Sequence, residues 1–342
     1  MDVLPERYIR LSRFQPIGVG GVKLLRHKRV VIVGVGALGT VQAEMLVRSG
    51  VGELTLIDRD YVDLTNLQRQ TLFTENDVQQ QMPKAIAAKK RLEAVNREVK
   101  INAFISDLNA GNAENLLLGH DVILDGTDNF ETRLLINDIS VKHRIPWIYG
   151  AATGSYGLVY TFRPGETACF SCVYRYMPIG GETCETVGII GPAAQLTASL
   201  QCAEAMKILT DNNQNLRKHL FYFDLWSNEF STIALDGILD SSCKTCQSHQ
   251  FPYLQNENGT KIGVLCGRNT VQIRPSGNAV FHYQDTASRL KNTGLNVQTN
   301  DYLTQLTLSE HRIVLFKDGR ALIHGTNKIE DAKQLYQKYI GG

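Results

Sequence analysis

Residues 29–58, RVVIVGVGALGTVQAEMLVRSGVGELTLID, decide the fold of this chain. The apolar, β-branched run at residues 30–33 is typical of a buried parallel strand. A glycine turn over residues 34–39 follows, and then come a helical pattern and a second strand that ends on Asp58. A strand, a glycine turn, a helix and a strand with an acid at its tip predict a nucleotide-binding βαβ unit.

Five residues of this unit are candidates for nucleotide contacts. Glycines let the backbone approach phosphate groups, and the N-terminus of the following helix attracts anions. The acid about 20 residues further on can accept hydrogen bonds from ribose hydroxyls. We therefore predict that a nucleotide binds at Gly34, Gly36, Ala37, Gly39 and Asp58. On this unit alone, the default function is that of a nicotinamide-dependent oxidoreductase.

A second group of polar residues favours a triphosphate over a dinucleotide. Arg69 and Lys84 are cations, and a triphosphate needs cations because charge builds up on the leaving pyrophosphate. Asp128 follows a predicted strand at 121–124, and ligands bind beyond the carboxyl ends of strands in open sheets. A carboxylate there could hold Mg²⁺ between phosphates. The alternative for Arg69 is a solvated loop charge, and for Lys84 the start of a helix.

Composition limits the other function classes. The chain has 342 residues, 43% of them hydrophobic, which is enough for a large core and suggests two domains. The net charge is +2 and no long basic run is present, so neither nucleic acid nor an anionic membrane surface is expected as the main partner. The N-terminus lacks the apolar segment of a signal peptide, and no stretch approaches about 18 continuous apolar residues. We therefore expect a cytoplasmic protein.

The seven cysteines include two pairs with the same C-x-x-C spacing, Cys169 with Cys172 and Cys243 with Cys246. Four thiolates match the tetrahedral preference of structural Zn²⁺, so we predict one zinc ion held by both pairs. The alternative is four unrelated thiols. Cys184 lies in a glycine-flanked loop and is a candidate reactive thiol.

The order of predicted elements indicates an α/β fold. Helices and strands alternate up to about residue 150, which predicts a Rossmann-like, doubly wound and mainly parallel sheet. Three later strands, at 157–162, 220–225 and 230–235, are expected to extend this sheet in an antiparallel sense. We predict an adenylation domain with its zinc at 1–250, a linker at 251–260, and a small C-terminal α/β module of unknown role at 261–342.

Several of these segments together resemble the ThiF/MoeB family, the bacterial relatives of ubiquitin-activating enzymes. The resemblance covers roughly residues 5–248, and its most specific motif is NLQRQ at 66–70. It rests on GVGALG, LIDRDYVDLTNLQRQTLF, a Pro-Lys pair, LDGTDN, both C-x-x-C pairs and a Thr-Cys pair. The resemblance implies MgATP-dependent adenylation of the C-terminal glycine carboxylate of a small β-grasp sulfur carrier that ends in Gly-Gly.

The resemblance also implies roles for single residues. Asn66, Arg69 and Lys84 would contact the triphosphate, and Asp128 would bind magnesium. Arg10 matches an arginine that reaches the ATP site of the other subunit of a homodimer. Cys184 matches a cysteine that takes part in transferring the carrier or its sulfur. The chain departs from the family pattern at two positions, where Gln81 and Ala37 stand in place of glycines.

These observations predict an adenylyltransferase that uses ATP, Mg²⁺ and Zn²⁺. A ThiS-like carrier of the thiamin pathway is the first choice of substrate because of Cys184, and a MoaD-like carrier of molybdopterin biosynthesis is the second. A cysteine desulfurase is a candidate sulfur donor. The nicotinamide-dependent oxidoreductase and a non-catalytic scaffold stay as alternatives of other classes.

Overall fold

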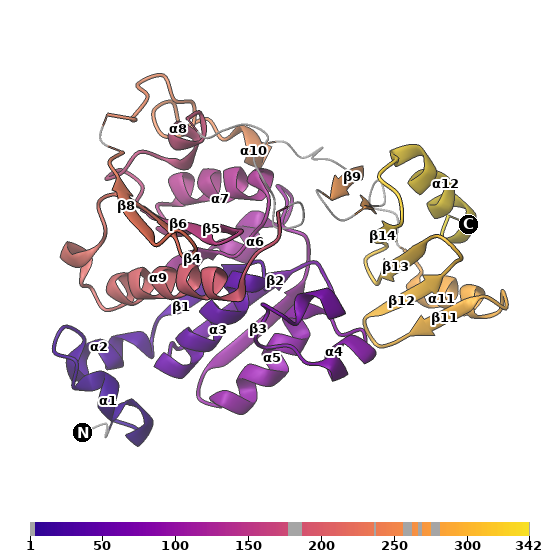
Figure 1. The fold of residues 1–342 in the computed structure, drawn as a ribbon, viewed down its shortest axis with the longest axis horizontal. Coiled ribbons are helices and arrows are strands. Elements are labelled where there is room, and N and C mark those ends of the chain that lie inside the picture. Colours follow the sequence, from indigo (N-terminus) through magenta and orange to yellow (C-terminus); the bar gives the residue numbers. More distant parts are fainter. Residues whose placement is uncertain are drawn as a thin grey trace. The chain divides into compact units, whose positions relative to one another are not determined.

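The computed structural model describes residues 4–176, 187–235, 237–255, 262–265, 269–274 and 281–341. The described residues form two compact units, the first made of those up to residue 255 and the second of those from residue 262 (Figure 1). Each unit has a sheet of its own, with eight strands in the first and six in the second. The predicted α/β fold class is confirmed.

Five neighbouring strands of the large sheet are parallel, in the order β3-β2-β1-β4-β5. The chain moves outward in one direction from β1 and in the other from β4, so the point where the order reverses lies between these two strands. Their side chains are almost all buried, which explains the continuous apolar runs in the sequence. The five strands are Arg29–Val33 (β1), Glu53–Asp58 (β2), Lys100–Ile105 (β3), Val122–Asp125 (β4) and Trp147–Thr153 (β5).

Helices cover both faces of this sheet (Figure 1). On one face, the helix after the glycine turn packs against the long helix at residues 191–209. On the other face, a second group of helices packs around the buried Trp147. On the first face lie Ala37–Ser49 (α3), Lys84–Val95 (α5) and Gly191–Leu209 (α9), and on the second Ala113–Leu117 (α6) and Phe130–His143 (α7). A doubly wound sheet is therefore present as predicted.

The predicted antiparallel extension is confirmed. Strands Tyr156–Phe162 (β6), Leu220–Asp224 (β7) and Glu229–Ile233 (β8) follow β5 in spatial order, and each pairs antiparallel with its neighbour. The lead-in before β1 lies outside the sheet and consists of Glu6–Tyr8 (η1), Ile9–Ser12 (α1) and Gly18–Leu25 (α2). Short elements Phe170–Tyr174 (α8) and Asn213–Asn215 (η3) complete this part of the unit.

Two segments are more ordered than the sequence indicated. Residues 59–83 are mostly polar and show little hydrophobic periodicity, yet they contain the 3-10 helix Leu64–Asn66 (η2) and the helix Glu75–Gln79 (α4), each begun by a capping box. Elements this short show no hydrophobic period, so the pattern missed them. The predicted linker likewise contains the helix Pro252–Gln255 (α10). Gln81 has φ +51°, the left-handed conformation that a glycine adopts without strain.

The second unit is an antiparallel sheet in the order β11-β12-β13-β14-β10-β9 with helices packed on it. Two four-residue strands, Ile262–Leu265 (β9) and Asn296–Thr299 (β11), form the edges of this sheet. The other elements of this unit are Thr270–Ile273 (β10), Tyr283–Lys291 (α11), Leu303–Thr307 (β12), Arg312–Phe316 (β13), Ala321–His324 (β14) and Ile329–Tyr339 (α12). Across the described ranges, each helix is too short or too polar to cross a membrane.

Candidate nucleotide site and cysteine cluster

The glycine turn packs backbone against backbone. Gly34 has φ +88°, and a Cβ there would lie 2.5 Å from the carbonyl oxygen of Gly126. A Cβ on Gly39 would lie 2.0 Å from the carbonyl oxygen of Gly34. Gly36, which precedes α3, is different, because the nearest described atom to a Cβ there is Nε2 of Gln70 at 3.8 Å. Gly34 and Gly39 therefore close the turn, and Gly36 leaves room for a ligand at the helix N-terminus.

Asp58 joins the end of β2 to this turn. One carboxylate oxygen accepts a 2.6 Å hydrogen bond from the Val35 amide, and the other accepts a 2.7 Å bond from the Asp60 amide. Burial raises the pKa of Asp58, an effect that the nearby Lys84 ammonium opposes. Each carboxylate oxygen has a second lone pair, so Asp58 can still accept hydrogen bonds from a ligand.

Lys84 begins α5, and its side chain is only 4% exposed. Its ammonium lies 3.5 Å from the carboxylate of Asp60, which is two residues beyond Asp58. On the same edge, the Arg59 guanidinium pairs with Asp107 at 3.2 Å. The structure thus brings Lys84 to the tip of β2, near Asp58.

The segment 66–70 carries Asn66, Arg69 and Gln70. The Asn66 side chain accepts a 3.1 Å bond from the Asp63 amide and so helps to cap η2. Arg69 is half-buried and donates a 2.9 Å bond to the Thr65 carbonyl. Gln70 is 4% exposed, and its Oε1 has no hydrogen-bond partner among the described residues. Because its amide faces the open side of Gly36, Gln70 belongs to the candidate site, although the sequence did not single it out.

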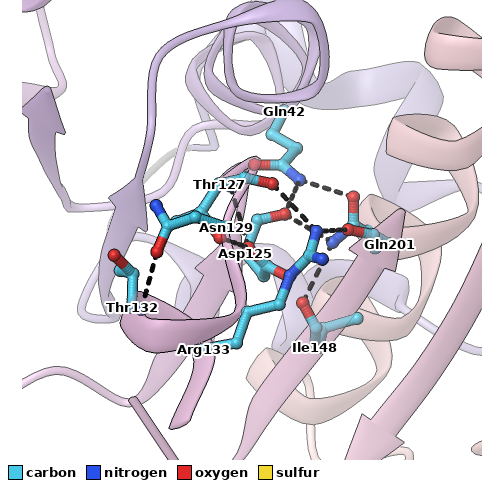
Figure 2. Close-up of polar contacts among 9 residues, drawn as sticks. Gln42, Asp125, Thr127, Asn129, Thr132, Arg133, Ile148 and Gln201 are labelled. Carbon is cyan, nitrogen blue, oxygen red and sulfur yellow. Dashed lines mark hydrogen bonds and ion pairs between the residues drawn. The ribbon is translucent and has the colours of Figure 1, made fainter. Parts of the chain in front are cut away.

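A buried polar network fixes the end of β4 (Figure 2). The Arg133 Nε donates a 2.8 Å bond to the Asp125 carboxylate, and its Nη2 donates to the carbonyls of Thr127 and Gly150 at 2.8 and 3.0 Å. Gln201 on α9 donates to the carbonyls of Asp125 and Ile148, both at 2.9 Å. This network ties helices on both faces of the sheet to the same strand end.

Asp128 lies just beyond this network, in the connection from β4 to α7, and is exposed. Burial lowers the pKa of Arg133, but the Asp125 carboxylate and, more weakly, that of Asp128 reverse the direction and raise it. Asn129 caps α7 through a 2.8 Å bond from the Thr132 amide (Figure 2). The packing of Gly34 on Gly126 places the 125–129 connection beside the glycine turn. Asp128 is thus an accessible carboxylate at the carboxyl edge of the sheet.

Arg10 lies elsewhere. The ring of Tyr8 covers Gly50, which caps the C-terminal end of α3, and its hydroxyl accepts a 2.8 Å bond from Asn96. Since α3 has 13 residues, its ends are about 20 Å apart. Arg10, exposed on α1, is therefore near the opposite end of α3 from the glycine turn of its own chain.

The four predicted zinc ligands come together. Sulfur–sulfur distances are 3.9 Å for Cys169–Cys172, 3.7 Å for Cys169–Cys243 and 3.6 Å for Cys172–Cys246, and all four sulfurs lie within 4.8 Å of one another. A tetrahedral zinc ion with Zn–S bonds of about 2.3 Å requires sulfurs about 3.8 Å apart. Three of the six sulfur–sulfur distances are close to this value, so the cluster suits a tetrahedral zinc ion.

Asp138 on α7 supports the chain around this cluster. One of its oxygens accepts a 3.2 Å bond from the Thr245 hydroxyl, and the other accepts bonds from the amides of Tyr253 and Leu254 at 2.8 and 3.3 Å. Burial raises the pKa of Asp138 to about 6, although these hydrogen bonds oppose the shift. The carboxylate thus anchors the segment from the second cysteine pair to α10. Cys184 lies outside the described residues.

Comparison with known proteins identifies the first unit. The model of the ThiF family matches residues 8–245. The chain belongs to the ThiF family. A "Sulfur carrier protein ThiS adenylyltransferase" of Bacillus subtilis (strain 168) is 48% identical over 335 residues, which cover 98% of this chain and 99% of that protein. The resemblance inferred from the motifs is thereby confirmed.

Two other proteins match about 70% of the chain. A "Molybdopterin-synthase adenylyltransferase" of Salmonella typhimurium is 32% identical over 242 residues, which cover 70% of this chain and 95% of that protein. The crystal structure of E. coli MccB with ATP has a TM-score of 0.61 and 22% identity, over 71% of this chain and 75% of that one. At this identity the MccB structure supports the fold alone.

Proposed function

We propose that this ThiF-family protein uses ATP to adenylate the C-terminal carboxylate of a ThiS-like sulfur carrier. The carboxylate attacks the α-phosphorus of ATP, an acyl–phosphate anhydride forms, and pyrophosphate leaves. The observation that carries the proposal is the meeting of the glycine turn, Asp58 and Lys84 at one edge of the sheet. The near full-length match to the Bacillus ThiS adenylyltransferase supports the same reaction.

The chain's own residues fit a triphosphate. The open position at Gly36 and the N-terminus of α3 suit the phosphates, and Asp58 suits the ribose. Asn66, Arg69 and Lys84 would then stabilise the charge that develops on the leaving pyrophosphate. Asp128, as one exposed carboxylate beside the phosphates, suits Mg²⁺, which usually binds through one or two carboxylates plus substrate oxygens.

The carrier is the part of the function on which the relatives differ. A ThiS-like carrier is favoured, because the relative named for ThiS matches at 48% identity and over both units. The relative named for molybdopterin synthase matches at 32% and over 70% of the chain, which supports a MoaD-like carrier less well. The nicotinamide-dependent oxidoreductase is not supported, since the chain belongs to the ThiF family and Lys84 reaches the tip of β2.

The cysteine cluster would hold a structural zinc ion. Four protein ligands leave no coordination position for water or substrate, so the ion would stabilise the fold and take no part in the transfer. It would link α8, which begins next to Cys169, to the segment that Asp138 anchors.

We further propose a homodimer in which Arg10 serves the site of the partner. Two observations support this arrangement. Arg10 lies near the far end of α3 from its own glycine turn, and the lead-in exposes large apolar side chains that a second copy could cover: Ile9, Phe14, Val19 and Leu24. An arginine supplied by a partner would add positive charge at the reacting phosphates.

The test of the reaction is carrier-dependent exchange of labelled pyrophosphate into ATP. Exchange should occur with a Gly-Gly-tailed ThiS-like carrier, and Asp128→Ala should reduce it by roughly 100-fold or more. Tight binding of NADH without exchange would contradict the proposal.

The dimer is tested by mixing inactive subunits. A mixture of Arg10→Ala and Asp128→Ala subunits forms one site with both residues intact, so activity should return above that of either parent. If activity does not return although the subunits exchange, Arg10 does not act in trans.

A further inference from the structure

We propose that Asp60 is a positioning residue that holds the Lys84 ammonium in place for the triphosphate, an inference that rests on the proposed function. The Asp60 carboxylate lies 3.5 Å from the Lys84 ammonium, and the two side chains are only 11% and 4% exposed. Asp60 also lies 4.0 Å from Arg59, whose guanidinium pairs with Asp107. Asp60 is therefore the acid that contacts Lys84, and Asp107 serves a different cation on the same edge.

The backbone holds Asp60 and Lys84 opposite each other. The Lys84 amide donates a 2.9 Å bond to the Asp60 carbonyl, and the Val62 amide donates a 2.8 Å bond to the Met82 carbonyl. These bonds form a short antiparallel pairing between the start of the 59–83 connection and its end. The Asp60 amide in turn donates to Asp58, which accepts from Val35 in the glycine turn. A continuous chain of hydrogen bonds thus links the glycine turn to Lys84.

This arrangement solves a physical problem for a buried lysine. The lysine side chain is a flexible four-carbon stem, and fixing it in one direction costs rotamer entropy. A buried ammonium without a partner is costly, and breaking a buried pair leaves an uncompensated charge. Asp60 neutralises Lys84 and fixes its direction before ATP arrives. A cation already in place needs no reorganisation when charge develops on the leaving pyrophosphate.

A double-mutant cycle tests this role. Asp60→Asn keeps the size of the side chain and removes its charge, and Lys84→Met removes the ammonium. Each single change should lower kcat/KM for ATP in the carrier-dependent exchange by roughly 10- to 100-fold, the scale of a misplaced catalytic group. If Asp60 acts through Lys84, the double variant should be within about twofold of Lys84→Met. Losses that multiply in the double variant would overturn the proposal.

Asp77→Asn is the matched control. Asp77 is an acid of the same 59–83 connection, and it caps α4 by accepting a 2.8 Å bond from the Thr74 amide. The control should stay within about twofold of wild type, whereas an equal loss would mean that Asp60→Asn only loosens the connection. Absence of exchange in the wild type would count against the proposed function instead. The same cycle, measured as equilibrium binding of ATP, would then decide the role of Asp60.

Discussion

The buried pair of Arg133 and Asp125 makes the sharpest prediction about stability. Replacing Arg133 with methionine keeps most of the side-chain volume but removes three hydrogen bonds and leaves the Asp125 carboxylate, which is 0% exposed, without its cation. Breaking a buried ion pair from one side costs about 3–5 kcal/mol of unfolding free energy. The 125–129 connection, which carries Asp128, should loosen as well, so exchange activity should fall.

Urea unfolding followed by tryptophan fluorescence measures this effect, because both tryptophans lie in the first unit and Trp147 is fully buried. Lys142→Met is the matched control, because it removes a cation from the same helix. Lys142 forms a 2.8 Å ion pair with Glu114, and each of these two side chains is 39% exposed. That pair should contribute less than about 1 kcal/mol. If Arg133→Met loses no more stability than Lys142→Met, the network does not support the site as argued.

Three further predictions concern the cysteines and Asp138. Cys243→Ser should remove zinc, measured by metal analysis, and lower the unfolding midpoint while ATP binding changes little; wild-type protein free of zinc would contradict this. Burial raises the pKa of Asp138 from its ordinary 3.8 to about 6, so the stability that its protonated form adds to the folded state is complete below about pH 4 and is lost as the pH rises through 6. Wild type should therefore lose stability relative to Asp138→Asn across that window in urea titrations, and a constant difference would refute the assignment. Cys184→Ser should leave pyrophosphate exchange nearly intact and impair thiocarboxylate formation; thiocarboxylate made at the normal rate would mean that the thiol is a bystander.

The nucleotide-binding βαβ unit could be predicted from the sequence, because its residues are close together along the chain. A β-branched run, a glycine turn and an acid at a fixed distance define β1, α3 and β2 without tertiary information. The identical spacing of the two C-x-x-C pairs likewise predicted a cluster that the structure assembles to within 4.8 Å. The prediction of an antiparallel extension also succeeded. The strand pairs β5–β6 and β7–β8 each follow one another without a helix between them, and such strands can be joined by a hairpin as antiparallel neighbours.

The supporting residues could not be predicted in the same way. Asp60 and Lys84 lie at opposite ends of a polar connection, and only the tertiary fold shows that they form a buried pair. Gln201 and Arg133 occupy helices as ordinary polar residues, and their role depends on burial at the end of β4. For α4 a local signal existed and was missed, because Thr74 and Asp77 form a capping box without a hydrophobic period to accompany it.

The central claim, adenylation of a carrier, is tested most directly by the intact mass of the carrier. The enzyme is incubated with ATP, Mg²⁺ and a ThiS-like carrier, with pyrophosphatase present to prevent reversal. The carrier that ends in Gly-Gly should gain the mass of one AMP group, and a carrier without its final glycine should not. No mass gain with the intact tail, under conditions in which the enzyme binds both ATP and the carrier, would contradict the account.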